Sequence, residues 1–590
     1  MVYILTALIC LFKLLSCTLE NYNICAILKI FSFFCQKIKM AKTNEDIKDV
    51  LSNTSRLASY NMVLQLSFRL LTFFLNAFTL RYITKDELGV VNVRLVLLYS
   101  TLLFLSREAF RRACLSQAPK RDDKHENYVL EWRKMMNLLW CIVPIGLFFT
   151  SLLTYIWMNH LSKPDPVLVP YYSTAALIFG ISVVIELLAE PLFIFAQALM
   201  FVRLRVLSEG IPMILKCLTT VILIVLFPKM GILAFCVAQI IFSISYVFII
   251  YGFFTWYIST ENYKKFDDFP FTSMMQFFPT STLPSSVDSD TASLIWSFFK
   301  QSALKQILTE GEKYVMTIFN VLTFGDQGVY DVVNNLGSMA ARFIFLPIEE
   351  SFYVFFAKML ERGVPLQAQN QEKVKLVRHV LFCVLRLVVL IGLVILVFGF
   401  SYSYIFLHLY GGSLLSEGSG PGLLRVYSFY VLLIAINGTT ECFVFAAMSQ
   451  KDVDKYNQKM LIFSLLFLTS SYYFTIYLGS VGFIFANCLN MIVRIIHSFY
   501  FIKRYFKGHK GLDPLTALTP HWFVVQTFVA AFTICWLSEN ICHGLSMIYY
   551  VIHIIIGAAC LAGLLYVLYL AEEKVVEFLK EQYFSKKKKA

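Results

Sequence analysis

The chain has 590 residues, of which 58% are apolar and 15% carry a charge, and its formal net charge is +13 at pH 7. So few charged residues exclude a set of ordinary soluble domains, because a hydrated surface needs more of them. The apolar residues come in runs of about 20, which matches a hydrocarbon core roughly 30 Å thick. No water at that depth can pair with the backbone, so the runs are predicted to be helices.

Residues 1–39 are apolar but are interrupted by Lys13 and Lys29. They fit a signal peptide followed by a weak span, and they also fit an upstream extension that does not belong to the authentic protein. The second interpretation is favoured because the composition turns abruptly polar at Met40, where the sequence continues AKTNEDIKD.

From Met40 onward the predicted fold class is an all-α polytopic membrane protein with about fourteen transmembrane helices. The spans are expected near 57–83, 88–106, 137–158, 171–197, 206–227, 231–256, 299–323, 327–357, 377–409, 424–448, 458–478, 481–506, 521–537 and 546–570. Segment 257–290 contains prolines and Ser/Thr/Asp clusters that break any helical period, and it is therefore expected to be a cytosolic linker.

Basic residues alternate between the loops that join these spans. The loop after the second span carries Arg111, Arg112, Lys120, Arg121, Lys124, Arg133 and Lys134, whereas the turns near 410–423, 478–481 and 538–545 contain no Lys or Arg. Because cytosolic loops retain Lys and Arg, the alternation predicts that both termini are cytosolic. The net positive charge therefore reflects the basic residues of the cytosolic loops and does not indicate a nucleic-acid partner.

The C-terminal tail ends in KKKKA, with lysines at the third and fourth positions from the end. This pattern fits a cytosolic dilysine retrieval signal, which predicts the endoplasmic reticulum membrane as the location. It fits equally well a plain basic anchor that lies beside anionic membrane lipids.

Two stretches of the chain repeat each other at corresponding positions. E-P-L-F-I-F-A from Glu190 is followed 251 positions later by E-C-F-V-F-A-A from Glu441, and G-V-V-N from Gly89 is echoed by G-V-Y-D from Gly328. Such matches favour duplication of a six-helix unit. The prediction is two parallel six-helix lobes around a central cavity, at 40–256 and 291–510, with two additional helices and a basic tail at 511–590.

Polar residues lie at helical spacing within the expected spans. The first span carries Gln65, Arg69, Thr72 and Asn76, the second carries Arg94, Thr101, Glu108 and Arg112, and the eighth carries Asp331, Asn335, Ser338, Arg342 and Glu349. Ionisable groups are costly at membrane depth, so they face a cavity or a partner. Acids with a coupling or structural role are expected at Glu186, Glu190, Glu310, Glu349 and Glu441.

Two interpretations of these charges stay open at this point. In the first, the charged residues pair with one another as structural contacts, for which Glu108 and Arg112 have the favourable helical spacing. In the second, they bind a transported molecule, the guest. Arg69, Arg94 and Arg342 have no acid within one turn. Arginine in such a place indicates an anionic guest, because its planar fork binds phosphate oxygens through two hydrogen bonds.

No sequence motif of an enzyme is present. The chain has no GxxxxGK[ST], no nucleophile elbow and no HExxH, and its 14 cysteines are scattered without a CxxC pair. These absences predict no ATP site, no cofactor and no metal site, and they favour a transporter over an enzyme.

Two long segments make the chain recognisable. V-N-V-R-L-V-L-L-Y-S-T-L-L-F-L-S-R-E-A-F-R-R-A-C-L (91–115) and the region from Q-I-L-T-E-G-E-K-Y-V-M-T through P-I-E-E-S-F-Y-V-F-F-A-K (306–358) resemble the "requiring fifty-three" oligosaccharide-lipid translocation family of the endoplasmic reticulum, within the multidrug, oligosaccharidyl-lipid and polysaccharide exporter superfamily. The resemblance implies translocation of Man5GlcNAc2-PP-dolichol from the cytosolic to the luminal leaflet for N-glycosylation.

Carried over to this sequence, the resemblance implies that arginines receive the diphosphate and the sugar hydroxyls. The candidate substrate-binding residues are Arg69, Arg94, Arg107, Arg111, Arg112 and Arg342, with the polar neighbours Gln65, Asn76, Glu108 and Asn335. Two other hypotheses remain: a membrane scaffold or accessory that organises glycan-assembly enzymes, and a cation-coupled small-molecule antiporter that uses acids such as Glu190 and Glu441.

Overall fold

The structure is a computed structural model that describes residues 68–119, 125–261, 269–280, 289–362, 364, 366–507, 513–542 and 547–584. Every regular element within these ranges is a helix. The expected extension 1–39, the candidate residue Gln65, residues 57–67 of the first expected span, and parts of the linker and the basic tail lie outside the described residues.

The helices before the linker form one packed set, here called the first set. It comprises the helix Phe68–Thr79 and α4 (Lys85–Gly89), α5 (Val96–Ser116), α6 (His125–Trp140), α7 (Ile142–Asn159), α8 (Tyr172–Leu187), α9 (Glu190–Ala198), α10 (Val202–Leu226) and α11 (Ile232–Ser259). A π-helical segment, Val90–Leu95, joins α4 to α5 without a break. One apolar core runs through α5 to α11, since each helix turns a mostly apolar face inward.

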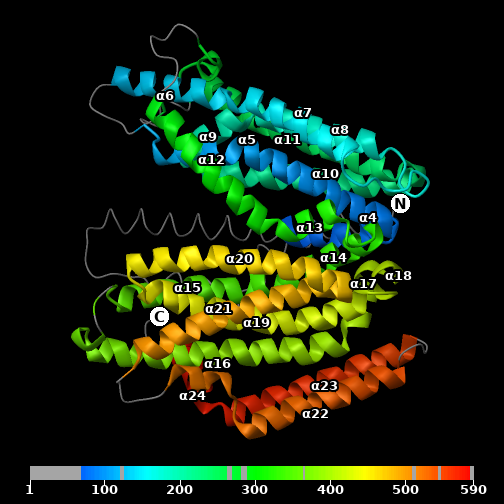
Figure 1. Ribbon diagram of the computed structural model, residues 1–590, viewed down its shortest axis with the longest axis vertical. Helices are drawn as coiled ribbons and strands as arrows, with labels where there is room; N and C mark the ends of the chain where they lie inside the picture. Colours follow the sequence, from blue (N-terminus) through cyan, green and yellow to red (C-terminus); the bar gives the residue numbers. More distant parts are fainter. Residues whose placement is uncertain are drawn as a thin grey trace.

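The helices after the linker form a second set, stacked below the first in Figure 1. It comprises α13 (Gly311–Phe319), α14 (Phe324–Ala340), α15 (Leu346–Met359), α16 (Gln371–Ser401), α17 (Ser403–Gly411), α18 (Ser413–Ser416), α19 (Gly420–Ala447), α20 (Gln450–Leu478) and α21 (Val481–Tyr505). A second π-helical segment, Ala341–Phe345, joins α14 to α15. Helix α12 (Ser289–Thr309) precedes this set and lies against α5 of the first set.

The last three helices pack on the outer side of α16. They are α22 (Trp522–Cys542), α23 (Met547–Ala571) and α24 (Glu573–Phe584). A small apolar core joins α16, α22 and α23, and Arg386 of α16 forms a buried ion pair with Glu572 (3.3 Å) before α24. Short 3₁₀ turns at Pro228–Met230, Met274–Phe277, Leu366–Ala368 and Pro514–Leu518 complete the described elements.

Within the described residues, ten helices are long and apolar enough to cross a membrane, and eleven if α8 and α9, bent by 45°, form one span. The chain is therefore a polytopic helical membrane protein, while the number fourteen and the two lobes stay predictions. Some expected spans are interrupted: 171–197 between α8 and α9, 299–323 between α12 and α13, and 377–409 between α16 and α17. A sequence window counts apolar residues but does not detect such breaks.

Part of the expected linker is held firmly by the first set. Phe269, Phe271 and Phe277 are buried in the core of that set. Trp140 donates its indole N–H to the backbone oxygen of Phe277 (2.7 Å). Residues 269–280 therefore belong structurally to the first set and do not form a free tether.

The two sets meet where α4 crosses α14, at the right-hand end of Figure 1. A Cβ on Gly89 would lie 1.7 Å from the backbone oxygen of Phe324, and a Cβ on Gly328 would lie 2.6 Å from the amide nitrogen of Gly89. The glycines that open the two matching sequence motifs therefore touch backbone to backbone. We call this region the closed end.

Replacing either glycine of this crossing with alanine is expected to destabilise the protein. The added methyl group overlaps backbone atoms that cannot move aside independently, at a cost of about 1–3 kcal/mol for Gly89→Ala or Gly328→Ala. The control is Gly252→Ala in α11, where no atom lies within 4 Å of the new Cβ and a helical Gly→Ala change gains about 0.5–1 kcal/mol. Thermal unfolding in detergent measures all three, and equal midpoints would contradict this account of the crossing.

Candidate functional site

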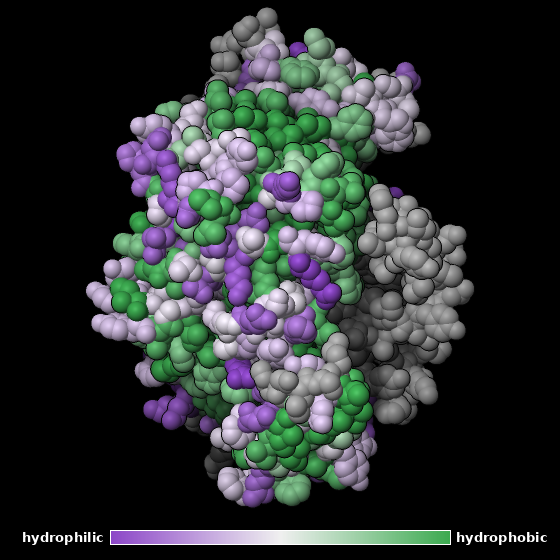
Figure 2. Space-filling model, turned by 90° about the vertical axis from the view of Figure 1, so that its right-hand side faces the viewer, coloured by the Kyte–Doolittle hydropathy of each residue, from purple (hydrophilic) through white to green (hydrophobic). Residues whose placement is uncertain are grey.

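Several polar contacts join the two sets at the closed end. Arg81 donates to the backbone oxygen of Leu409 (2.8 Å), and the Lys85 ammonium donates to the backbone oxygen of Glu417 (3.2 Å). Figure 2 views the molecule from this end, and hydrophilic side chains gather over the middle of the face. Because both acceptors are backbone carbonyls, these contacts depend on the position of the loops and not on the side chains that the loops carry.

Arg94 makes the most deeply buried of these contacts. Its side chain is 0% exposed, and it donates to the backbone oxygen of Thr317 (2.8 Å), to Asn320 Oδ1 (3.0 Å) and to Ser162 Oγ (3.1 Å). Its guanidinium also lies 5.0 Å from the centre of the Phe324 ring. Thr317 is in the last turn of α13 and Asn320 follows that helix with φ 48°. The cation therefore caps the negative end of the α13 dipole, across the boundary between the sets.

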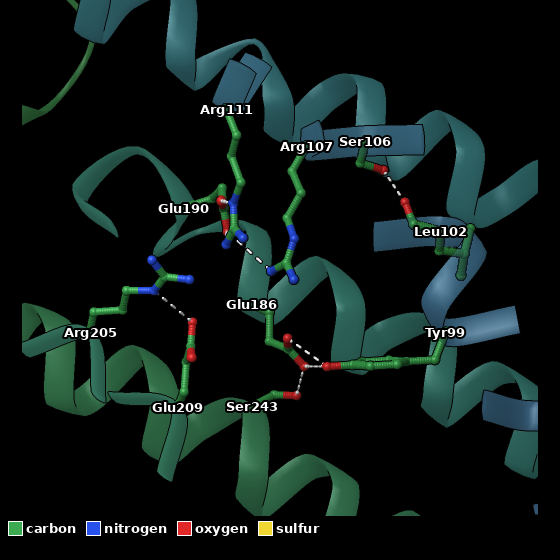
Figure 3. A network of polar contacts seen from close by, with 10 residues as sticks. All are labelled: Tyr99, Leu102, Ser106, Arg107, Arg111, Glu186, Glu190, Arg205, Glu209 and Ser243. Atoms are coloured by element: carbon green, nitrogen blue, oxygen red, sulfur yellow. Dashed lines mark hydrogen bonds and ion pairs between the residues drawn. The ribbon is translucent and has the colours of Figure 1, made fainter. Parts of the chain in front are cut away.

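Arg107 and Arg111 converge on one carboxylate. Glu190, at the start of α9, is 0% exposed, and it accepts hydrogen bonds from Arg107 Nη1 (3.2 Å), Arg111 Nη2 (3.0 Å) and Arg111 Nε. Figure 3 shows both arginine side chains extending from α5 to this acid. Two guanidinium groups share this carboxylate, and the Glu186 carboxylate on α8 also interacts electrostatically with Arg107.

Glu186 lies one turn before Glu190 but has different partners. Its carboxylate accepts hydrogen bonds from the hydroxyl of Tyr99 (2.8 Å) and from Ser243 Oγ (2.9 Å), as Figure 3 shows. The expected pair of acids on one face of the fourth span therefore divides into an ion-paired carboxylate and a hydroxyl-bonded one. Both satisfy protein groups inside the first set.

Arg112 and Glu108 pair with each other within α5, as their spacing allows, with Arg112 Nε 2.8 Å from Glu108 Oε1. Both side chains are about one third exposed. An ion pair of this kind contributes about 0–1 kcal/mol, so it constrains neither residue strongly.

Arg342 is exposed, and its contacts are confined to its own helix. It lies in the second π-helical segment and donates to the backbone oxygen of Asn335 (2.8 Å) and to Ser338 Oγ (2.9 Å). Asn335, also exposed, donates its amide to Asp331 Oδ2 (3.1 Å). The guanidinium thus retains N–H groups that a guest can use.

The first span contributes two candidate residues to the described part. Arg69 and Asn76 are both exposed on the helix Phe68–Thr79. Asn76 Oδ1 accepts a long contact from the Cys217 thiol (3.8 Å) of α10. Arg69 resembles Arg342 in presenting its charge at the surface of the described helices.

The acids of the second set are held in three different ways. Glu310, between α12 and α13, pairs with Lys313 (3.4 Å). The carboxylate of Glu349 lies against Gly438 of α19, where a Cβ would meet its oxygen at 1.7 Å. Glu441 accepts hydrogen bonds from Arg494 Nε (2.8 Å) and Nη2 (2.5 Å).

The sequence-predicted residues thus do not form one cluster in this conformation. Arg94, the pair Arg107 and Arg111, and the pair Glu108 and Arg112 lie at successive depths along the second span, while Arg69, Asn76, Asn335 and Arg342 are exposed elsewhere on the two sets.

Sequence reasoning missed Ser162 and Asn320, the partners of Arg94, and Arg494, the partner of Glu441. Arg494 had a detectable signal, because it is a charge within the apolar run 481–506. Ser162 and Asn320 had none, because polar residues in loops are ordinary.

Known structures define the class. The lipid II flippase MurJ in an inward closed conformation aligns with a TM-score of 0.53 and 13% identity, covering 86% of this chain and 98% of that one. An inward-facing MATE multidrug transporter of the MOP superfamily aligns with a TM-score of 0.51 and 12% identity, covering 76% and 99%. The fold is therefore that of this group of helical membrane transporters.

The particular family follows from the sequence comparisons. The family model of the Rft protein matches residues 53–582, so the chain belongs to the Rft family. Proteins named Man(5)GlcNAc(2)-PP-dolichol translocation protein RFT1 are 49% identical in Xenopus tropicalis, covering 91% of this chain and 98% of that protein, and 47% identical in Mus musculus, covering 91% and 97%. The Drosophila melanogaster protein of that name is 39% identical, covering 84% and 92%.

The contacts of Glu190 predict a large effect on stability. Glu190→Gln removes the carboxylate that is ion-paired with both Arg107 and Arg111, and breaking a buried ion pair costs about 3–5 kcal/mol. We expect a much lower steady-state level and a lower unfolding midpoint. The matched control is Glu108→Gln, whose pair with Arg112, about one third exposed, contributes about 0–1 kcal/mol. Equal levels for the two variants would contradict a structural role for Glu190.

Proposed function

We propose that this protein moves Man5GlcNAc2-PP-dolichol from the cytosolic to the luminal leaflet of the endoplasmic reticulum membrane. The observation that carries this proposal is near full-length similarity to proteins named for that translocation, at 49% and 47% identity. Similarity of the fold to transporters supports it. The resident partners in this proposal are the dolichyl-diphosphate glycan and membrane lipids.

The guest is held by arginines that the protein itself leaves available. Arg69 and Arg342 are exposed, and Arg342 is bonded only within its own helix. Guanidinium groups bind diphosphate oxygens through paired hydrogen bonds, and two such residues neutralise much of the headgroup charge that opposes passage. The dolichyl chain stays in lipid between the two sets, because burying it elsewhere would gain nothing over the bilayer.

Arg107 and Arg111 act on the headgroup through their field. Glu190 accepts hydrogen bonds from both residues, so they are not free ligands. Their guanidinium groups are partly exposed, and their positive potential attracts an anion at short range. The chain has no P-loop. We therefore assign an ATP-independent cycle in which the closed end, on the luminal side by the charge rule, opens as the cytosolic side closes.

The decisive experiment is leaflet exchange by the purified protein. Liposomes that contain the protein and a dolichyl-diphosphate glycan are treated with a membrane-impermeant reagent that modifies the glycan on the outer leaflet. Exchange gives complete modification with time, whereas protein-free liposomes stop near half. Modification that stops near half with folded protein present would instead favour a scaffold or accessory that organises glycan-assembly enzymes.

Replacing the available arginines separates binding from structure. Arg342→Ala and Arg69→Ala remove no ion pair that the described contacts contain, so we expect near-normal protein levels with exchange reduced about tenfold or more, because each loses a charge-assisted bidentate contact of roughly 1.5–3 kcal/mol. Arg→Lys variants restore only part of the activity, since an ammonium lacks the fork. Full activity of both alanine variants would remove these residues from the binding site.

Reporters test the orientation. A glycosylation reporter placed within 412–420 is expected to be modified, since that turn lies in the lumen, and a reporter after residue 590 is expected to stay unmodified, because the charge pattern predicts a cytosolic tail. A glycosylated C-terminal reporter would reverse the assignment of the closed end to the luminal side.

A further inference from the structure

The closed end contains one cation that is both a bridge between the sets and a candidate phosphate ligand. Arg94 comes from the first set, and two of its three hydrogen-bond acceptors, the Thr317 carbonyl and Asn320 Oδ1, belong to the second set. The third, Ser162 Oγ, belongs to the first set. All three are uncharged groups.

Because its acceptors are uncharged, Arg94 can exchange these hydrogen bonds for bonds to an anion. A diphosphate offers the guanidinium paired hydrogen bonds together with opposite charge, whereas a carbonyl, an amide or a hydroxyl oxygen accepts a single hydrogen bond and carries no net charge. Arg94 contrasts in this respect with Arg107 and Arg111, whose buried carboxylate holds them in place. An anion that reaches Arg94 therefore competes with the contacts that join the two sets.

We infer that Arg94 is the release element of the closed end: its bonds to α13 and Asn320 hold the two sets together until a diphosphate headgroup takes over the guanidinium. The inference rests on the proposed function for the identity of that headgroup. It assigns a gating role to Arg94 in addition to any contact with the guest. It also explains why the residue is fully buried in a conformation whose sets are in contact.

The remaining contacts of the closed end suit such a release. Among the described contacts, Arg81 and Lys85 each donate one hydrogen bond across the boundary, to the backbone oxygens of Leu409 and Glu417. The crossing of Gly89 and Gly328 contributes close packing, and Leu80, Leu88 and Val93 of the first set join the apolar core of the second set there. These contacts are apolar and carry no charge. Once Arg94 is withdrawn, no buried ion pair among the described contacts joins the sets at this end, because Asp331, which interacts with Asn92 of the first set, has its charged partner Lys313 in the second set.

A cysteine pair reports whether the closed end is shut. A Cβ on Gly325 lies 3.2 Å from the Cβ of Lys85 on the other set, close to the 3.5–4.5 Å that disulfides need. The variant Lys85→Cys/Gly325→Cys is expected to cross-link under mild oxidation in liposomes, and the single-cysteine variants are the controls. Cross-linking blocks leaflet exchange, and a reductant restores it.

The release role is tested by the rate of this cross-linking. Dolichyl-diphosphate glycan in the liposomes is expected to slow cross-linking of the parent pair on the order of tenfold, the usual size of coupling between two sites. Asn320→Gly keeps the left-handed backbone but removes one acceptor across the boundary, so cross-linking is expected to be slower without lipid. Ser162→Ala is the matched control, because it removes an Arg94 bond within the first set only, and it is expected to match the parent.

Two results would overturn the inference. The first is that Asn320→Gly and Ser162→Ala cross-link at the same rate without lipid. The second is that Arg94→Gln cross-links like the parent without lipid and is still slowed by the lipid to the same extent. Failure of the proposed function is a separate result, since it is read from leaflet exchange by the protein without the cysteine pair. The comparison of Asn320→Gly with Ser162→Ala without lipid tests the gating role of Arg94 independently of the identity of the substrate.

Discussion

The structure depends on the cost of burying charge where no water is present. Glu190 and Glu441, the acids of the two matching motifs, are each buried and each held by arginine. In the first set the arginines come from α5, whereas in the second set Arg494 comes from α21. The two matching motifs both contain an acid, and in each set of helices this acid is neutralised by arginine from a different helix.

The same cost separates arginines that look alike in the sequence. Residues bonded to a buried carboxylate cannot leave it without stranding a charge, so Arg107 and Arg111 stabilise the first set. Residues bonded only to neutral groups or exposed on a helix, such as Arg94 and Arg342, can change partners cheaply. A translocator needs both kinds, because its helices must stay folded while its anionic cargo is passed along.

Among the described residues, no ion pair joins the two sets. Two glycines of equivalent sequence motifs meet, and a few hydrogen bonds to neutral acceptors surround them. A scaffold function demands no such arrangement, whereas alternating access requires an interface that closes tightly and still separates. A cation-coupled antiporter would draw on Glu190 and Glu441, and both are occupied by arginine in this conformation.

The sequence by itself determined the helical membrane class, because a run of apolar residues must form a helix in lipid whatever surrounds it. It also determined the paired acids of the repeat and the spacing of Glu108 and Arg112, which depend on local or repeated pattern. Only the tertiary structure decided which arginines are occupied, since Glu190 reaches Arg111 across 79 positions and Arg94 reaches Asn320 across 226. The breaks between α8 and α9 and between α12 and α13 were not detected by a count of apolar residues, although Pro191 in the first turn of α9 is a local signal for the first of them.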